Sequence, residues 1–367
     1  MIGLLELRRR KFQFSLIALI VTLISYLVLM INGLGVGLNR QAGSALRNFD
    51  ADAIAYAEEA GLSVIRSELS DELVERIASR PGLEAAAPIG YVAANYVAAD
   101  GMVDSAAFLG FDPGTIAEPR VVAGRPLTGS DTNGLLADKG FLRLSGLDIG
   151  DTVRVTLRLE TREFQIVGEI DEGSFFFQPA VYLLRSTWQS LKYGSIPEDQ
   201  RPDASIVILQ GNGLIGTYDG YDVVSRSTAF ANIEGVQGQQ STVQALRVFG
   251  YLIGALVIGV FFYVLTLQKV AQIGVLKAVG ASSAFVLQQI LVQVVVISVV
   301  GVGVSVPLAY ATDRALRRLP DAVPIAFETG TFVTTSLILL LTAVVGGLFS
   351  ARQVTKVDPI IALGQQQ

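Results

Sequence analysis

Between two long apolar runs of the chain lies the stretch Gln268-Lys269-Val270-Ala271-Gln272-Ile273-Gly274-Val275-Leu276-Lys277-Ala278-Val279-Gly280-Ala281-Ser282. It combines two lysines with an apolar spacing typical of a helix, and the sequence Gly-Ala-Ser ends it. Both flanking runs are long enough to be membrane spans, so the stretch predicts a short helix at the membrane surface. We expect a cytoplasmic partner to bind here and to act on the protein through this segment.

The composition favours a membrane protein. The chain has 367 residues, 51% hydrophobic and 17% charged, with a mean hydropathy of +0.50, on the apolar side of globular averages. Four segments are uncharged for about 20 residues or more, enough to cross a hydrocarbon core roughly 30 Å thick. One such segment could be a buried helix of a soluble core, but four favour membrane spans. The expected spans are residues 13–38, 247–267, 284–311 and 330–350.

Lysine and arginine predict the orientation of these spans, because positive charge is enriched on the cytoplasmic side. Three basic groups agree and place both termini and residues 268–283 in the cytoplasm, with the spans in the cytoplasmic membrane of a bacterium. One group dissents, since Arg314, Arg317 and Arg318 lie in the short loop 312–329, which this topology places outside. The agreeing groups are Arg8, Arg9, Arg10 and Lys11; Lys269 and Lys277; and Arg352 and Lys356.

The two ends of the chain receive simple assignments. Residues 1–12 carry four aliphatic side chains ahead of the arginines, which predicts a short interfacial helix on the cytoplasmic face. A cleaved signal peptide is the alternative, but the following apolar stretch is too long and no small-residue cleavage site follows it. We therefore expect the first span to stay as an anchor, and residues 351–367 to form a cytoplasmic tail.

The region between the first two spans predicts a large extracytoplasmic α+β domain, residues 39–246. It is acidic: residues 41–246 contain 15 Lys and Arg against 28 Asp and Glu, a net −13 in a chain of net charge −5, so the rest carries +8. Ser70 starts a capped amphipathic helix that ends before Pro81, and residues 151–157 and 164–167 predict a β-hairpin. We expect an early α+β part and a β-rich part from Arg120 to Gln210.

Both ends of this domain are expected to extend the neighbouring membrane helices outward as a stalk. The segments are residues 39–49 and 225–245, which lead directly out of the first span and into the second. A flexible linker is the alternative to a rigid helical connection, and Gly235 and Gly238 favour that alternative.

Several kinds of chemistry are excluded by residue type. The chain has no cysteine and no histidine, so it has no disulfide, no thiolate nucleophile, no Ser-His catalysis and no Cys/His metal site. It has no phosphate-binding Walker motif, and the glycines of residues 33–37 follow a membrane helix rather than a strand. Asp and Glu remain, but no pair predicts a catalytic site. We therefore expect no catalytic residue, no metal and no cofactor in this chain.

Residues within the spans have two possible roles. No charge lies in the middle of any span, which argues against ion-coupled transport, so energy must come from another source. Gly250 and Gly254 have the Gly-x-x-x-Gly spacing of close helix packing and are candidates for a homodimer contact. The candidate residues for a hydrophobic cargo path or tyrosinate ligation of haem are Tyr26, Met30, Tyr251 and Tyr263, with ordinary membrane packing as the alternative.

An aromatic cluster in the outer region also has two explanations. Phe175-Phe176-Phe177, together with Tyr182 and Trp188, could face a cargo or partner, or could be part of the β-domain core.

The pattern of one span, a large outer domain and three further spans resembles the MacB/FtsX-type permeases of ABC transporters. The stretch from Lys269 to Ser282 is similar to the loop between the second and third helices of that family. The tail from Ala351 to Leu363, with Asp-Pro and Ala-Leu, resembles the family's C-terminal signature, and residues 147–153 and 164–168 match its β-rich part. Size and the Asn32-Gly33-Leu34 exit from the first helix resemble the HrtB/DevC branch, associated with export of haem or glycolipids.

This resemblance implies a homodimer in which each copy binds one separate ATPase subunit, and that ATP and Mg²⁺ belong to the ATPase. Segment 268–283 would contain the coupling helix. Many family members carry Glu where this chain has Gln272, so a charged contact is missing here or replaced by the lysines. The implied coupling residues are Lys269, Gln272, Ile273, Gly274, Leu276, Lys277, Gly280, Ala281 and Ser282.

Two functions follow as expectations. The first is ATP-driven export of a hydrophobic or amphipathic compound such as haem, a lipid or a drug-like molecule, with movement transmitted from the ATPase to the outer domain. The second is an FtsX-like regulator that controls an extracytoplasmic partner such as a cell-wall hydrolase. Membrane lipid is an expected partner, an extracytoplasmic adaptor is left open, and no nucleic acid is expected. An enzyme with an outer catalytic domain is the least favoured class.

Overall fold

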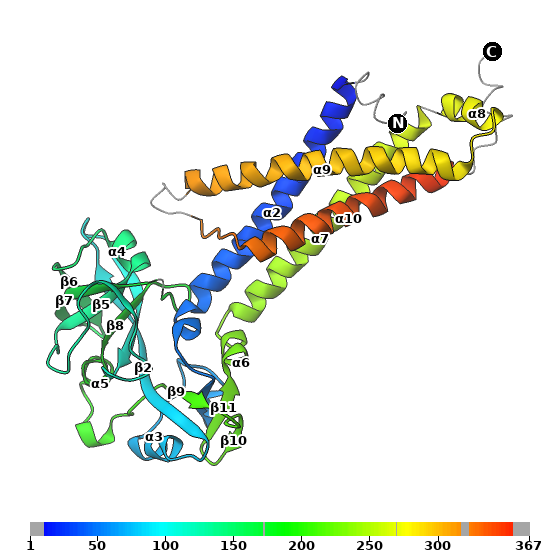
Figure 1. The fold of residues 1–367 in the computed structure, drawn as a ribbon. Helices are drawn as coiled ribbons and strands as arrows, with labels where there is room; N and C mark the ends of the chain where they lie inside the picture. The colour runs from blue at the N-terminus through cyan, green and yellow to red at the C-terminus, as the bar shows by residue number, and fades with distance from the viewer. Residues whose placement is uncertain (1–10, 172, 269, 317–322, 355–367) are drawn as a thin grey trace. The chain divides into compact units, whose positions relative to one another are not determined.

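A computed structural model of the chain describes residues 11–171, 173–268, 270–316 and 323–354. Most of the expected interfacial helix, Lys269 and most of the expected tail lie outside these residues. The chain divides into two compact units, one formed by Met1–Gly37 with Gln240–Gln367 and one formed by Leu38–Gln239. Each unit is described by itself (Figure 1).

The first unit is a bundle of long apolar helices. Within the described ranges, four helices are long and apolar enough to cross a membrane, with mean hydropathy between 2.0 and 2.7 over their most apolar windows. The expected four membrane helices are thus confirmed, and a fifth, short helix, α8, connects α7 to α9 (Figure 1). These helices are α2 (Lys11–Asn48), α7 (Val236–Leu267), α8 (Val270–Ala278), α9 (Ser283–Leu316) and α10 (Thr329–Val354).

Glycine allows the bundle helices to approach closely. A Cβ on Gly346 of α10 would lie 2.6 Å from the carbonyl oxygen of Ala255 in α7, and a Cβ on Gly301 of α9 would lie 2.6 Å from a methyl of Val21 in α2. Distances this short leave no room for a side chain. Small residues therefore set the helix spacing inside the chain.

The second unit contains β-strands and short helices. The long strand β2 belongs to two sheets: its first half, 83–89, pairs with β9, and its second half, 90–97, pairs with β3. The strands are β1 (Ala53–Ala57), β2 (Leu83–Val97), β3 (Val103–Phe111), β4 (Val121–Gly124), β5 (Gly134–Asp138), β6 (Thr152–Leu157), β7 (Glu160–Ile170), β8 (Ala180–Leu184), β9 (Ile206–Gly211), β10 (Gly216–Tyr218) and β11 (Tyr221–Ser225). The helices are η1 (Glu58–Ala60), α3 (Asp71–Ala78), α4 (Lys139–Ser145), α5 (Arg185–Tyr193), η2 (Glu198–Gln200) and α6 (Arg226–Ala231).

These pairings make two parts that are not consecutive in sequence. One part has the strand order β10-β11-β1-β9-β2. In the other, β2, β3, β8, β5, β7 and β6 pair in turn, and β6 pairs again with β2, which closes a ring. The expected boundaries of the β-rich part, Arg120 and Gln210, are therefore wrong. The chain leaves the first part along β2 and returns to it along β9, a long-range pairing without a local sequence signal.

Local sequence signals were more reliable. The helix expected at Ser70 is α3, and the Ser70 hydroxyl accepts a hydrogen bond from the Leu73 N–H at 3.4 Å. The expected hairpin is formed by β6 and β7, which pair antiparallel. Helix α2 does continue to Asn48, but α7 begins only at Val236, so the extension expected from 225 is two helices with a break between them.

Candidate functional site

Helix α8 is held to the bundle by one side of its surface. Ile273 is only 5% exposed and belongs to a cluster with Phe14 of α2, Phe262 of α7 and Val286 of α9. Gly274 is buried beside it. Helix α8 is thus packed into the same buried cluster as α2, α7 and α9.

The opposite side of α8 is an exposed stripe formed by Gln272 and Val275 of the helix and by Val279, the first residue after it, whose N–H still donates to the Val275 carbonyl at 3.0 Å. Their spacings of three and four residues place them on one face of the helix. Val275 is 51% and Val279 is 84% exposed, and Gln272 is exposed too. We call this surface the α8 stripe. When apolar side chains are this exposed on a short connecting helix, they are suited to binding a partner.

The end of α8 is a sharp turn. Gly280 has a φ of +101°, which glycine adopts without strain, and its N–H donates to the Lys277 carbonyl at 3.0 Å. The Ser282 hydroxyl then accepts the Phe285 N–H at 3.2 Å and caps α9. Ala281 lies between them, half-buried. Lys269 and the side chain of Leu276 lie outside the described parts of the chain.

The four candidate cargo residues do not converge on one place. Tyr26 and Met30 pack against a cluster that includes Phe332, and the Tyr26 hydroxyl lies 3.0 Å from the Thr312 hydroxyl. Tyr251 packs against a different cluster, and Tyr263 is 36% exposed on α7. Their role in a cargo path stays a prediction, and three of them already have packing roles.

The two candidate dimer glycines contact the same chain. A Cβ on Gly250 would lie 3.0 Å from a methyl of Val28, and one on Gly254 would lie 3.2 Å from a methyl of Ile24. Both partners belong to α2 of this chain. The close approach therefore serves packing of α7 on α2, and a dimer contact at these glycines stays a prediction.

The aromatic cluster is mostly core, as one of its two explanations proposed. Phe175, Tyr182 and Trp188 are at most 2% exposed, but Trp188 lies in a different core from the other two. Phe177 is 37% exposed. Residues adjacent in the sequence thus differ in burial, and the loop that carries Phe175–Phe177 also contacts helix α2.

That loop fills an interruption in helix α2. At Gly43, φ and ψ are −167° and 41°, which are not helical values. A continuous helix would bond the carbonyls of residues 41 and 42 to N–H groups four residues later. We define the α2 joint as residues 41–45 together with the loop 174–177, all within the 38–239 unit.

Backbone hydrogen bonds connect the two pieces of the α2 joint. They satisfy polar groups that the interruption leaves without helical partners. The Ser44 hydroxyl adds a side-chain bond to the Ser174 carbonyl at 3.3 Å. The backbone bonds are Phe176 N–H to Ala42 O at 3.0 Å, Phe177 N–H to Gln41 O at 3.0 Å and Ala45 N–H to Ser174 O at 3.2 Å.

Asp138 holds the loop closed at its base. Its carboxylate is fully buried and accepts three backbone N–H bonds, from Phe141 at 2.5 Å, Gly173 at 3.3 Å and Ala180 at 3.1 Å. One residue therefore caps α4 and fixes both ends of the loop.

The connection between α6 and α7 packs on the α2 joint from the other side. A Cβ on Gly43 would lie 2.6 Å from Cδ1 of Ile233 and 2.9 Å from the Phe230 ring. The Ser63 hydroxyl donates a hydrogen bond to the Glu234 carboxylate in the same connection. The end of α2 and the residues just before α7 thus both lie beside the loop 174–177 within the 38–239 unit.

The described residues hold no group of three or more Asp and Glu side chains placed to bind a metal ion.

Comparisons with known proteins agree with this picture. The MacB-like periplasmic core domain family matches residues 14–247, and the FtsX-like permease C-terminal family matches residues 245–359. The chain belongs to the MacB/FtsX-like family of ABC transporter permeases. The resemblance expected from the coupling stretch and the tail is thereby confirmed.

Individual relatives of this MacB/FtsX-like permease cover nearly its whole length. A permease named HrtB of a hemin transport system, from Staphylococcus haemolyticus, is 26% identical over 98% of this chain and 97% of that protein. An uncharacterized ABC transporter permease of Mycobacterium tuberculosis is 24% identical over 98% and 97%. The periplasmic region of MacB from Actinobacillus actinomycetemcomitans has a TM-score of 0.36 and 13% identity, over 51% of this chain and 94% of that one.

Two sets of candidate residues in this permease were not predicted from the sequence. Val275 and Val279 were open to discovery, because helical spacing from Gln272 places them on one face. Gly43 and Asp138 were not, because Ile233 at Gly43, and Gly173 and Ala180 at Asp138, lie more than 30 residues away in the sequence.

Proposed function

We propose that this permease exports a hydrophobic or amphipathic compound, driven by two separate ATPase subunits that bind two copies of the chain. The observation that carries this proposal is the α8 stripe, an exposed face on a helix whose other face is packed on three membrane helices. A nucleotide-driven partner seated on the stripe would move the bundle without any nucleotide chemistry in this chain.

The movement has a covalent route to the outer domain. Helices α2 and α7 each run from the helical unit into the 38–239 unit, crossing at residues 37–38 and 239–240. Within that unit, the end of α2 and the residues just before α7 meet in and around the α2 joint. We propose that ATP binding shifts these two helices and that the α2 joint passes the shift to the β-strands. Such a mechanism requires that the outer domain has two states. The partner ATPase must bind ATP with a different affinity in each state.

For the cargo, relatives named for hemin transport make haem the first compound to test. The chain has no histidine, so an iron ligand would be Tyr, Met or a carboxylate. The exposed side of α7 is available to lipid or to a second copy, since the Gly250 and Gly254 side is occupied by α2. The exposed side of α7 includes Phe249, Leu252, Ile253, Leu256 and Val260.

The test replaces apolar contacts of the α8 stripe by charge. We expect Val275→Asp with Val279→Asp to reduce ATPase co-purification and transport-dependent haem resistance at least about tenfold, because burying an unpaired carboxylate is costly. Ile215→Asp, at a 63% exposed position of the outer domain, is the matched control and should change neither. Unchanged assembly in the double variant would refute ATPase docking on this stripe.

A regulator of an outer partner is the second candidate, favoured by the FtsX-like match over residues 245–359. If the ATPase binds the stripe but deletion of the permease changes only cell separation, and not sensitivity to haem or other amphipathic compounds, the regulator is correct.

A further inference from the structure

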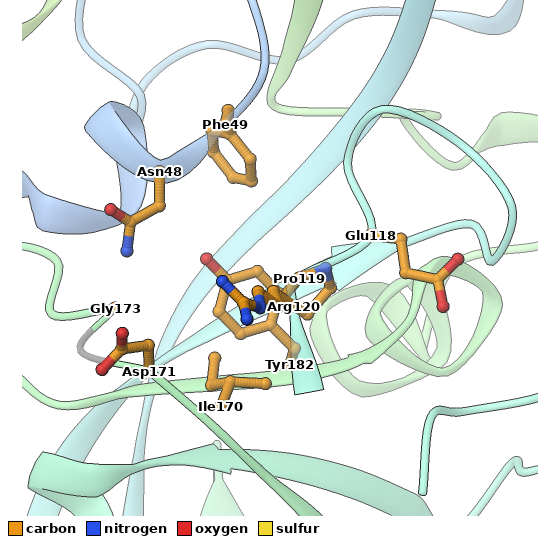
Figure 2. A pocket seen from close by; sticks show the side chains of 9 residues that line it. All are labelled: Asn48, Phe49, Glu118, Pro119, Arg120, Ile170, Asp171, Gly173 and Tyr182. Atoms are coloured by element: carbon orange, nitrogen blue, oxygen red, sulfur yellow. The ribbon is translucent and has the colours of Figure 1, made fainter. Parts of the chain in front are cut away.

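The 38–239 unit contains a cavity of about 230 Å³ beside the α2 joint (Figure 2). It is bounded by the end of α2, the segment before β4, the segment after β7, and strand β8. The residues that line it are Asn48, Phe49, Glu118, Pro119, Arg120, Ile170, Asp171, Gly173 and Tyr182.

One wall of the cavity is apolar and aromatic. Phe49 and Tyr182 are 5% and 2% exposed, and their rings meet edge to face with centroids 6.5 Å apart. Ile170 adds an aliphatic surface. Burial, with a smaller contribution from the Asp138 carboxylate, raises the pKa of the Tyr182 hydroxyl, so it stays neutral. A flat apolar ring fits this wall.

The charged side chains around the cavity differ in whether they already have a hydrogen-bond or ion-pair partner. Asp171 pairs with Lys139 at 3.1 Å, and Glu118 accepts the Gly114 N–H at 2.7 Å. Arg120 is exposed and, among the residues that the structure describes, has no hydrogen-bond or ion-pair partner. Figure 2 shows its guanidinium among the lining side chains, near the middle of the view. A free guanidinium selects a carboxylate or a similar planar anion.

The size of the cavity limits its ligand. Sites for drug-sized molecules are roughly 300–1,000 Å³, and this one is smaller. It suits a single ring with a short acidic arm, and a tetrapyrrole macrocycle does not fit. The cavity is therefore a different site from any that would hold a haem-sized cargo.

We propose that this cavity binds a small aromatic carboxylate, with the ring on Phe49 and Tyr182 and the carboxylate on Arg120. Such a ligand touches both the end of α2 and Gly173 at the base of the loop 174–177. Its binding would hold the α2 joint in one arrangement and so regulate the permease. Binding itself is independent of the proposed export function, and only its regulatory effect rests on that function.

The test uses the absence of cysteine from the natural chain. Asn48→Cys, in the full-length protein in lipid nanodiscs, places a single thiol at the cavity for maleimide labelling. Phenylacetate is the probe, benzyl alcohol supplies the ring without charge, and acetate supplies the charge without the ring. We expect saturating phenylacetate to slow labelling at least about threefold, and the other two to have no effect. Phenylacetate should also raise the unfolding midpoint of the unsubstituted protein.

Arginine variants decide whether the cavity is the site. Arg120→Gln should abolish protection by phenylacetate, whereas Arg143→Gln, at an exposed arginine of α4, should retain it. No protection at tens of millimolar, protection that survives Arg120→Gln, or equal protection by acetate would each overturn the proposal.

The regulatory effect has its own measurement. Phenylacetate should change permease-dependent ATPase activity at least about twofold in the natural chain and leave it unchanged in Arg120→Gln. Protection without this change keeps the site and rejects regulation. Protection in a protein that exports nothing keeps the site and rejects the proposed function.

Discussion

The α8 stripe and the α2 joint are built in opposite ways. The stripe is three exposed side chains, two on the nine-residue helix α8 and Val279 directly after it, all within one short stretch of sequence. The α2 joint is hydrogen-bonded backbone from separate segments, closed by a carboxylate that is fully buried. Exposed side chains suit an interface that a partner binds and leaves. A connection that is to keep its shape while neighbouring helices move is stabilised by satisfied backbone hydrogen bonds.

The backbone of the α2 joint is locally unfavourable. Phe176 and Phe177 have φ values of 50° and 62°, in the left-handed region that costs roughly 1–2 kcal/mol for each non-glycine residue. The hydrogen bonds to residues 41 and 42 and the packing of both Phe175 and Phe176 on Tyr91 offset this cost. Such a conformation persists only where the surroundings fix it. The α8 stripe has no comparable strain.

The largest effect is expected at Asp138. Asp138→Ala removes the acceptor of three backbone N–H groups and leaves them buried, which should lower the free energy of unfolding of the outer domain by about 3–5 kcal/mol. Trp188 is the single tryptophan of the chain and is fully buried in this unit, so urea titration by tryptophan fluorescence reports on the outer domain of the full-length protein.

Asp219→Ala is the control, since that carboxylate is fully exposed and pairs with Arg76 on the surface. It should cost less than about 1 kcal/mol. Equal losses of unfolding free energy for Asp138→Ala and Asp219→Ala would show that the hydrogen bonds of Asp138 stabilise the outer domain no more than a surface ion pair does.

Gly43→Ala is expected to have the next largest effect. The added Cβ must displace Ile233 and Phe230, which should cost about 1–3 kcal/mol of outer-domain stability. If the α2 joint transmits movement, export should fall at least about threefold more than the ATPase activity does. Stability is read from Trp188, and export is measured beside ATP hydrolysis in the same vesicles.

Gly238→Ala is the matched control, because it lies in α7 and its Cβ would meet open space. It should keep export and slightly raise stability, as alanine favours a helix by about 0.5–1 kcal/mol over glycine. An unchanged ratio of export to ATP hydrolysis in Gly43→Ala would remove the α2 joint from the transmission route.

The contrast between the two regions also explains what the sequence could predict. The membrane helices, α3 with its Ser70 cap and the β6–β7 hairpin depend on periodicity and neighbouring residues, and all were predicted. The coupling stretch was prominent because its signals are contiguous. The α8 stripe required only the spacing of Gln272, Val275 and Val279.

The α2 joint had no comparable signal. Gly43 resembles any small residue at the end of a membrane helix, and Asp138 resembles an ordinary helix cap. Their roles depend on a loop that lies more than 100 residues beyond Gly43 and on the division of β2 between two sheets. Long-range pairing has no local pattern, which is also why the expected boundaries at Arg120 and Gln210 were wrong.

A smaller effect is expected from alkaline pH at Tyr91, which packs on the loop of the α2 joint. Burial, and then the Glu234 carboxylate, raises the pKa of Tyr91 to about 12, above its ordinary value of 10. The neutral form is favoured in the fold, so this contribution is complete below pH 10 and is lost as the pH rises through 12. Between pH 9 and 10.5 Tyr91→Phe should remove about 1 kcal/mol of the fall in stability measured by urea titration.

The control for Tyr91 is Tyr218→Phe, a half-buried tyrosine in the other part of the same unit. If Tyr91→Phe and Tyr218→Phe reduce the fall in stability at alkaline pH by the same amount, the pH dependence does not arise at the α2 joint.

The smallest effect is expected on the α8 stripe, at Gln272. This residue is third in α8, where a carboxylate interacts favourably with the helix dipole by about 0.3–1 kcal/mol. Gln272→Glu should therefore stabilise α8 and raise the apparent affinity for the ATPase by up to about fivefold, whereas Gln272→Lys should lower it. Affinity is measured by titrating the ATPase into permease nanodiscs and recording hydrolysis.

The sign of these two changes separates the dipole from a direct contact. If the ATPase surface opposite Gln272 is acidic, Gln272→Glu will weaken binding although it favours the helix, and Gln272→Lys will strengthen it. If the dipole alone acts, the gain from Glu will diminish in high salt together with the loss from Lys. Neither variant should alter the Trp188 unfolding curve, because the α8 stripe lies outside the unit that Trp188 reports on. A change in that curve would mean that α8 and the α2 joint are coupled even without the ATPase.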